Sequence, residues 1–120
     1  MPTIAHVAPI LPVRDLARAM DFYRRLGFSA EAWQGGGSYG FIERDGHELH
    51  LSRSDKLTGN ESPSAAYFYL AKGSAESLQA EFRAAGVEIL SPLAPRPWNM
   101  KDFTISDPDG NHLHFGEHIS

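Results

Sequence analysis

Two stretches, Asp45-Gly-His-Glu-Leu-His-Leu51 and Asp109-Gly-Asn-His-Leu-His-Phe115, are nearly the same. Each begins with Asp-Gly, a pair typical of a tight hairpin turn. Each then alternates polar and apolar residues, the pattern of a strand with one buried face. In each, a His follows the Asp by five residues. The sequence therefore predicts the same hairpin at two places in the chain.

A second repeated element precedes each hairpin. The segment Tyr23-Arg-Arg-Leu-Gly27 matches Phe82-Arg-Ala-Ala-Gly86 at an offset of 59 residues, whereas the Asp-Gly pairs are offset by 64. Matched landmarks in matched order predict an internal duplication whose second copy is five residues longer, most simply in the loop around residues 92–98. Because Asp-Gly turns and helices that end at Gly are common, chance recurrence is the alternative.

The first half reads as strand, helix and three strands. Residues 5–13 are strand-like, and Pro9 and Pro12 indicate an edge strand or a strand that bends away. Asp15 is expected to cap the start of a helix. Gly27 is expected to end that helix, at a position that requires the left-handed backbone conformation. Apolar residues recur between them at helical spacing, and three strands are expected to follow, over residues 28–33, 39–44 and 47–52.

The second half repeats that order after a polar linker over residues 54–64. A strand is expected at 66–70, and a helix that Ser74 caps and Gly86 ends. The remaining expectations are a short strand at 87–90, a proline-containing loop at 91–100, and strands at 103–106 and 112–116.

Composition and charge narrow the class of protein. The 120 residues fit one domain, the net charge is −4, and there is no cysteine. The basic residues are scattered, so we expect no nucleic-acid partner. No signal-peptide pattern is visible near the start, and no run approaches the roughly 20 apolar residues of a membrane span. The expectation is a cytoplasmic protein without a membrane partner.

Longer stretches carry a family resemblance. The motifs PVRDLARAMDFYRRLGF, which begins at Pro12, and FTISDPDGNHLHF, which begins at Phe103, resemble the vicinal-oxygen-chelate superfamily of glyoxalase-like proteins. Within it, APILPVRDL, LHLSRS and PWNMKDFTISDPDGNHLHF look like the bleomycin resistance, or antibiotic-binding, branch. The likeness covers essentially the whole chain.

This resemblance implies an α+β fold in which two βαβββ modules form curved sheets around a cleft, with the helices outside. The single domain would span residues 1–120, with modules at about 1–53 and 65–120. The resemblance further implies a homodimer whose N-terminal strand is exchanged between subunits, that is, domain swapping. The prolines at 9 and 12 suit such a strand and equally suit a plain edge strand.

Enzymes of the superfamily hold a divalent metal with one ligand from the first and one from the last strand of each module. The matching positions on the last strands are His50 and His114. On the first strands they fall at Ala8, with His6 two residues earlier, and within residues 65–69, which offer no good ligand. Two imidazoles alone bind a metal weakly, so we expect no metal and no other cofactor. A site built from His50, His114, His6 and Glu48 is the arrangement that would restore one.

A cleft without metal can still bind a flat organic ligand, because stacking needs only rigid aromatic faces and a few placed polar groups. We expect the anion for a cationic ligand among Glu43, Glu48 and Asp102. The alternative for Trp33 and Tyr67 is a place in the core. Asp107 and Asp109 are expected to be turn residues whose side chains bond to local backbone donors. The predicted ligand-binding residues are Trp33, Tyr39, His50, Ser52, Tyr67, Tyr69, Trp98, Asp102 and His114.

These features favour a protein of antibiotic resistance that binds and sequesters a bleomycin-type glycopeptide, or a similar aromatic cationic small molecule, as a homodimer. No catalytic residue is predicted. The alternative is a metal-dependent enzyme of glyoxalase or dioxygenase type. A third possibility is a protein of this fold that binds an unrelated metabolite, because a shared fold does not assign a function.

Overall fold

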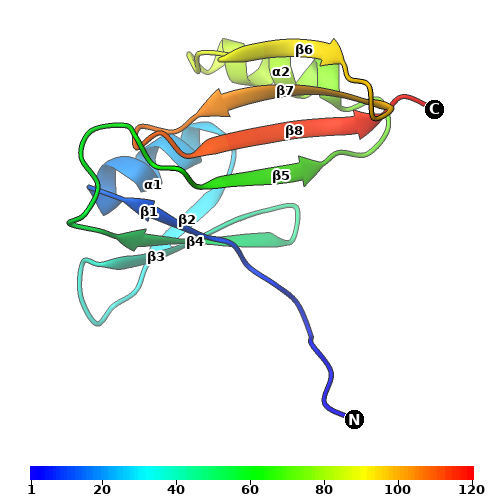
Figure 1. Ribbon diagram of the computed structural model, residues 1–120. Helices are drawn as coiled ribbons and strands as arrows, with labels where there is room; N and C mark the ends of the chain where they lie inside the picture. The colour runs from blue at the N-terminus through cyan, green and yellow to red at the C-terminus, as the bar shows by residue number, and fades with distance from the viewer.

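The order strand, helix, strand, strand, strand occurs twice along the chain (Figure 1). The computed structural model describes residues 1–120. The first module comprises β1 (Ile10–Val13), α1 (Leu16–Arg25), β2 (Ser29–Ala32), β3 (Tyr39–Arg44) and β4 (His47–Arg53). The second comprises β5 (Ala65–Tyr69), α2 (Ala75–Ala84), β6 (Ser91–Pro95), β7 (Met100–Ser106) and β8 (His112–His118). The predicted α+β fold of two βαβββ modules is therefore confirmed.

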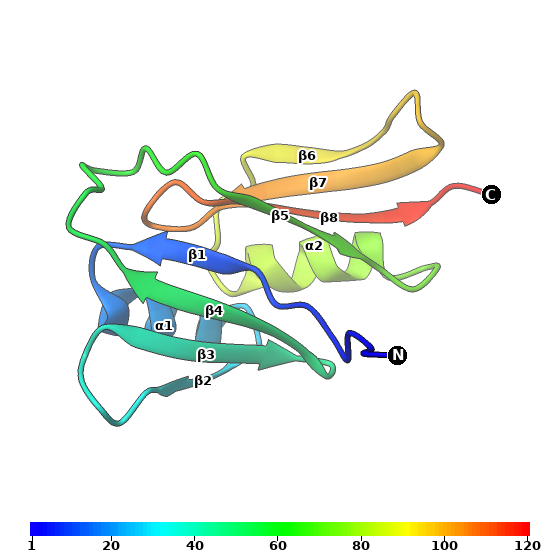
Figure 2. The ribbon, with the colours of Figure 1, turned by 60° about the horizontal axis from the view of Figure 1, so that its bottom comes forward.

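Each module forms its own four-stranded sheet. The strand order is β1-β4-β3-β2 in the first sheet, which we call sheet A, and β5-β8-β7-β6 in the second, sheet B. In both, the first strand runs parallel to the last and the other pairs are antiparallel. α1 packs against sheet A and α2 against sheet B, and the two sheets remain open rather than closing on each other (Figures 1 and 2).

The position of one strand differs from the prediction. Residues 87–90 form no strand, because Val87 turns into the core and its amide caps the end of α2 at the Phe82 carbonyl. The strand is instead β6, within the segment expected to be a loop. Its prolines are tolerated because β6 is an edge strand, and β1, which contains Pro12, is an edge strand as well. β1 is also shorter than expected, since residues 1–9 lie outside the sheet.

The two helices begin in different ways. The Asp15 side chain accepts a hydrogen bond from the Arg18 amide, as predicted for a cap. Ser74 occupies the equivalent position before α2 but makes no such bond, so this predicted cap is wrong. A side chain from β8 replaces it, because the Glu117 carboxylate accepts from the amides of Gly73 and Ala75 at 2.6 and 2.8 Å. These two bonds lower the pKa of Glu117.

The two Asp-Gly turns also differ. Asp45 and Gly46 both have positive φ, of 54° and 82°, which gives the predicted two-residue hairpin. The second turn is a longer loop over residues 107–111, in which Asp107 Oδ1 accepts from the amides of Asp109 and Asn111. The extra length of the second module is therefore not confined to residues 92–98.

Asp109 does more than shape its own turn, contrary to the prediction. Its side chain is completely buried, and Oδ1 accepts from the Arg14 amide at 2.9 Å, from the Arg14 side chain at 3.2 Å and from Arg18 at 3.3 Å. Asp107, also buried, accepts from the hydroxyl of Tyr23 on α1 at 2.8 Å. These contacts join the last loop of the second module to the first module, and one core of 18 buried residues is shared by both.

Neither helix has the length and apolar character of a membrane-spanning segment.

Candidate functional site

Each sheet has one face that no helix covers. On sheet A, alternation turns Leu11, Ile42, Leu49 and Leu51 into the core. Their neighbours along the strands occupy the open face, where cross-strand pairing aligns them in rows. This face carries Ile10, Tyr39, Phe41, Glu48, His50 and Ser52, and Trp33 directly follows β2 at the edge of the sheet.

His50 is held at the centre of that face by two hydrogen bonds. Nδ1 lies 2.7 Å from the Tyr39 hydroxyl, and Nε2 lies 2.6 Å from Glu48 Oε1. An ionised carboxylate only accepts, so Nε2 carries a proton, and in the neutral ring Nδ1 accepts from Tyr39. The edge-on rings of Tyr39 and Phe41 fix the imidazole from the sides, with centroids 5.3 and 5.0 Å away. His50 is therefore rigid and fully bonded.

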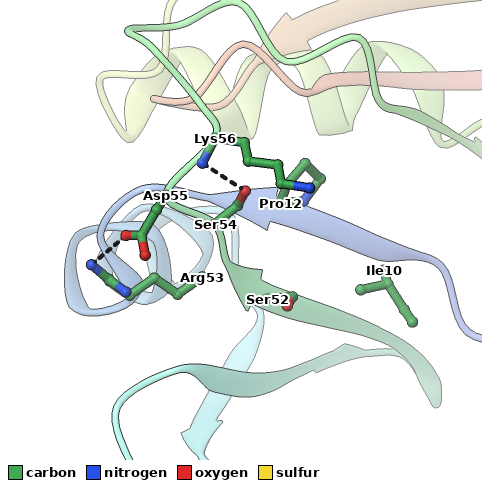
Figure 3. A pocket seen from close by; sticks show the side chains of 7 residues that line it. All are labelled: Ile10, Pro12, Ser52, Arg53, Ser54, Asp55 and Lys56. Carbon is green, nitrogen blue, oxygen red and sulfur yellow. Dashed lines mark hydrogen bonds and ion pairs between the residues drawn. The ribbon is translucent and has the colours of Figure 1, made fainter.

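A shallow cavity of about 520 Å³ lies at the end of this face (Figure 3). Ser52 and Arg53 at the end of β4, and Ile10 and Pro12 of β1, line one side. The other side is the start of the linker, residues 54–56, where Asp55 pairs with Arg53 at 2.8 Å. Of the predicted ligand contacts, Ser52 alone lines this cavity.

Sheet B presents a second aromatic and polar face. The Tyr67 hydroxyl donates to Asp102 Oδ2 at 2.9 Å, and Arg96 Nε donates to Asp102 Oδ1 at 2.7 Å. Burial and this carboxylate raise the pKa of Tyr67 to about 12, so the phenol stays protonated at neutral pH. Asp102, predicted as a ligand contact, is only 4% exposed.

His114 lies beside Tyr67 on the same face. Its Nδ1 is 2.7 Å from Thr104 Oγ1, and its ring stacks on Tyr67 with centroids 6.0 Å apart. The pKa of His114 is lowered mainly by burial and to a smaller extent by the neighbouring His112. The ring is therefore neutral at neutral pH. Tyr69 stacks in the same manner on His118, at the open end of the strand pair.

Both tryptophans are exposed rather than in the core. Trp33 is 51% exposed and its ring lies over Gly35, where any Cβ would overlap the indole. Trp98 is 62% exposed in the turn between β6 and β7. Burial of either in the core, the alternative open for Trp33, is excluded in this chain.

The predicted ligand-binding residues thus fall into two groups. Sheet A and its loop carry Trp33, Tyr39, His50 and Ser52, and sheet B with its turn carries Tyr67, Tyr69, Trp98, Asp102 and His114. Within one chain these groups lie on different sheets.

The donors expected of a metal centre do not assemble in this chain. No three or more His, Asp or Glu side chains are grouped so that they could hold a metal ion. The register partner of His50 is Ile10, not Ala8, and that of His114 is Tyr67. Both ring nitrogens of His50 are hydrogen-bonded to protein groups. The donor set therefore does not fit the metal of the superfamily's enzymes.

Three further residues of these faces were missed by sequence reasoning. Phe41 could have been found, since it alternates with Tyr39 on β3. Thr104 and Arg96 carried no such signal, because their roles depend on the partners that the β6–β7–β8 register gives them.

Comparison with known proteins places these features in a family. No curated protein matches this chain significantly. Among solved structures, a bleomycin resistance determinant encoded on the transposon Tn5 has a TM-score of 0.83 at 20% identity, covering 96% of this chain and 98% of that one. A bleomycin-binding protein complexed with bleomycin has a TM-score of 0.79 at 20% identity, covering 96% and 99%.

A glyoxalase/bleomycin resistance protein/dioxygenase from Nocardioides has a TM-score of 0.78 at 18% identity, covering 100% of this chain and 87% of that one. At such identities these structures establish the shared fold alone. The model of one family, however, matches residues 3–115. The chain therefore belongs to the Glyoxalase/Bleomycin resistance protein/Dioxygenase superfamily.

Proposed function

We propose that this protein binds and sequesters an aromatic, cationic small molecule of the bleomycin type without chemical conversion. The observation that carries the proposal is the pair of open sheet faces, on which aromatic rings are held rigidly beside hydrogen-bonding groups. Rigid rings stack on a flat ligand at little entropic cost. A solved structure of the same fold is a bleomycin-binding protein in complex with bleomycin, which supports this class of ligand.

We further propose that the binding unit is a homodimer. The accessible surface of one chain is 7237 Å², whereas a monomer of 13.2 kDa is expected to expose roughly 6,400 Å². Residues 1–9 contribute to this excess, since Ile4 and Val7 are 83% and 81% exposed. Such an exposed segment with apolar side chains is suited to exchange between subunits.

A groove of about 1100 Å³ between the modules is the proposed seat of the exchanged segment. Its floor includes Phe28, Leu49, Phe68, Phe82 and Phe115, and its rim includes residues 6, 7 and 9 of the same segment. The large apolar floor favours a covering chain over open water. In such a dimer, sheet A of one subunit could face sheet B of its partner, which would unite the two groups of predicted ligand contacts.

The test combines a thermal-shift screen with calorimetric titration, using metal-free bleomycin, copper-bound bleomycin and divalent metals alone. A ligand that binds only the folded state stabilises it by RT ln(1 + L/Kd), where L is the free ligand concentration, so Tm rises with the logarithm of ligand concentration above Kd. The proposal expects a shift with bleomycin and none with metals alone. A metal-dependent shift together with turnover of an organic substrate would instead identify the alternative, a metal-dependent enzyme of glyoxalase or dioxygenase type.

Two variants sharpen the test. Trp98→Ala should weaken bleomycin binding by about 1 kcal/mol, the contribution of one stacking contact. Leu90→Ala, which removes an exposed apolar side chain from another loop, serves as the control and should leave binding unchanged. Sedimentation of the unaltered chain reports the oligomeric state, and a strict monomer would refute the dimer. Equal affinities of Trp98→Ala and the unaltered chain would count against the proposed site.

A further inference from the structure

Asp102 is covered although it belongs to the open face of sheet B. Its side chain is 6% exposed, and both carboxylate oxygens are engaged by protein groups, Oδ1 by Arg96 and Oδ2 by Tyr67. Its charge is thus opposed by the guanidinium at 2.7 Å rather than presented to solvent. A ligand on this face meets the groups around Asp102 before it meets the carboxylate.

The bond to Asp102 determines where the Tyr67 ring lies. To reach Asp102 from β5, the Tyr67 side chain crosses β8 at Gly116, and any Cβ at position 116 would overlap the Tyr67 hydroxyl and lie 2.7 Å from the Asp102 Cβ. Gly116 therefore permits this crossing. The same placement sets the ring parallel to His114, with an interplanar angle of 19°.

The other oxygen of Asp102 fixes the turn that carries Trp98. The Arg96 guanidinium also reaches the Asp102 carbonyl and Ser91 Oγ, both at 3.4 Å. Arg96 is the first residue of that turn, since its carbonyl accepts from the Asn99 amide and its amide donates to the Met100 carbonyl. Trp98 follows Arg96 by two residues, so the anchor lies at the base of its turn.

We propose that Asp102 is a positioning residue, which holds Tyr67 directly and the Trp98 turn through Arg96, so that both aromatic surfaces form one preorganised wall without Asp102 touching the ligand. This inference rests on the proposed function and refines the ligand class. The Tyr67 hydroxyl donates its only hydrogen bond to Asp102, so toward a ligand its oxygen can only accept one. The wall therefore suits an aromatic molecule with N–H donors. A positive charge on that molecule must be met by carboxylates elsewhere, such as the exposed Glu43 and the half-buried Glu48 of sheet A.

The first measurement needs no ligand. In a Trp33→Phe background Trp98 is the only tryptophan, so its emission anisotropy and its quenching by acrylamide report the mobility of the turn. Asp102→Ala and Arg96→Ala should each lower the anisotropy and increase quenching. Asp21→Ala is the matched control, because it removes an Asp that pairs with Arg24 on an exposed helix surface. If Asp102→Ala and Asp21→Ala give the same Trp98 signals, the proposal is wrong.

The second measurement uses the conservative variant Asp102→Asn. It distinguishes an Asp102 that positions other side chains from an Asp102 that contacts the ligand directly. Asp102→Asn keeps an acceptor for Arg96 and a polar partner for Tyr67 but removes the charge. With metal-free bleomycin, Asp102→Ala should bind about tenfold more weakly than the unaltered chain, the cost of ordering two loosened side chains, and Asp102→Asn should recover most of that loss. Equal loss in Asn and Ala would identify a direct ion pair with the ligand and overturn the proposal.

The two ideas can fail separately. If the unaltered chain does not bind metal-free bleomycin, the proposed function fails, and the Trp98 signals alone then decide whether Asp102 positions the turn. If Asp102→Ala does not fold, Arg96→Ala still tests the Trp98 branch, and Tyr67→Phe tests the other. Tyr67→Phe should weaken binding while leaving the Trp98 anisotropy unchanged, because the two branches meet only at Asp102.

Discussion

Replacement of Asp109 by Ala should destabilise the protein more than the loss of any single exposed charge. Asp109 is fully buried, and one oxygen takes three donors from Arg14 and Arg18 of the first module. Breaking a buried ion pair costs about 3–5 kcal/mol. Two features reduce that figure: the arginine side chains are 36% and 44% exposed and can be rehydrated, and Oδ2 of Asp109 has no hydrogen-bond partner.

We therefore expect the free energy of unfolding to fall by about 3 kcal/mol, which for 120 residues corresponds to a Tm lower by roughly 12 °C. The measurement is urea unfolding followed by circular dichroism. Asp55→Ala is the control, because Asp55 pairs with Arg53 through an exposed side chain, and surface pairs contribute about 0–1 kcal/mol. Similar losses in the two variants would show that Asp109 does not join the modules in the way described.

Three further outcomes are expected. Gly116→Ala should displace Tyr67 from Asp102 because the added methyl group overlaps the phenol, and loss of the Tyr67–His114 stacking would be visible as changed NMR shifts of His114. The phenolate absorbance of Tyr67→Phe should equal that of the unaltered chain up to about pH 11, since the pKa of Tyr67 is raised to about 12; a phenolate difference at lower pH would contradict this. The lowered pKa of Glu117 adds stability above the ordinary Glu pKa of about 4.3, and this stability is lost as the pH falls through the folded value. Glu117→Gln should thus be less stable at neutral pH and show a shallower decline in acid, as measured by unfolding at several pH values.

Local patterns in the sequence were sufficient for much of the fold. Alternation and the Asp-Gly pair placed the β3–β4 hairpin, and Asp15 and Gly27 bounded α1, because each of these signals acts within a few residues. The cap of α2 could not be found in this way. It comes from Glu117, which is more than 40 residues from the amides it bonds.

Less of the candidate site could be predicted. The polar, proline-containing loop around Trp98 indicated an exposed aromatic residue, and Trp98 is exposed, whereas no local pattern distinguished an exposed Trp33 from a buried one. The division of the predicted ligand contacts between two separate sheets depends on how the modules pack, which no local pattern encodes. Likewise, the β6 strand was read as a loop because its prolines hide the edge-strand position that makes them harmless.

The Glu117 carboxylate, which caps the start of α2, has a consequence for the order in which parts of the chain fold. During synthesis α2 leaves the ribosome well before β8, so the Gly73 and Ala75 amides bond to water until the Glu117 carboxylate is available. This cap of α2 can therefore form only after Glu117 has been made. A chain that ends before Glu117 would lack the carboxylate that caps a helix more than 40 residues upstream.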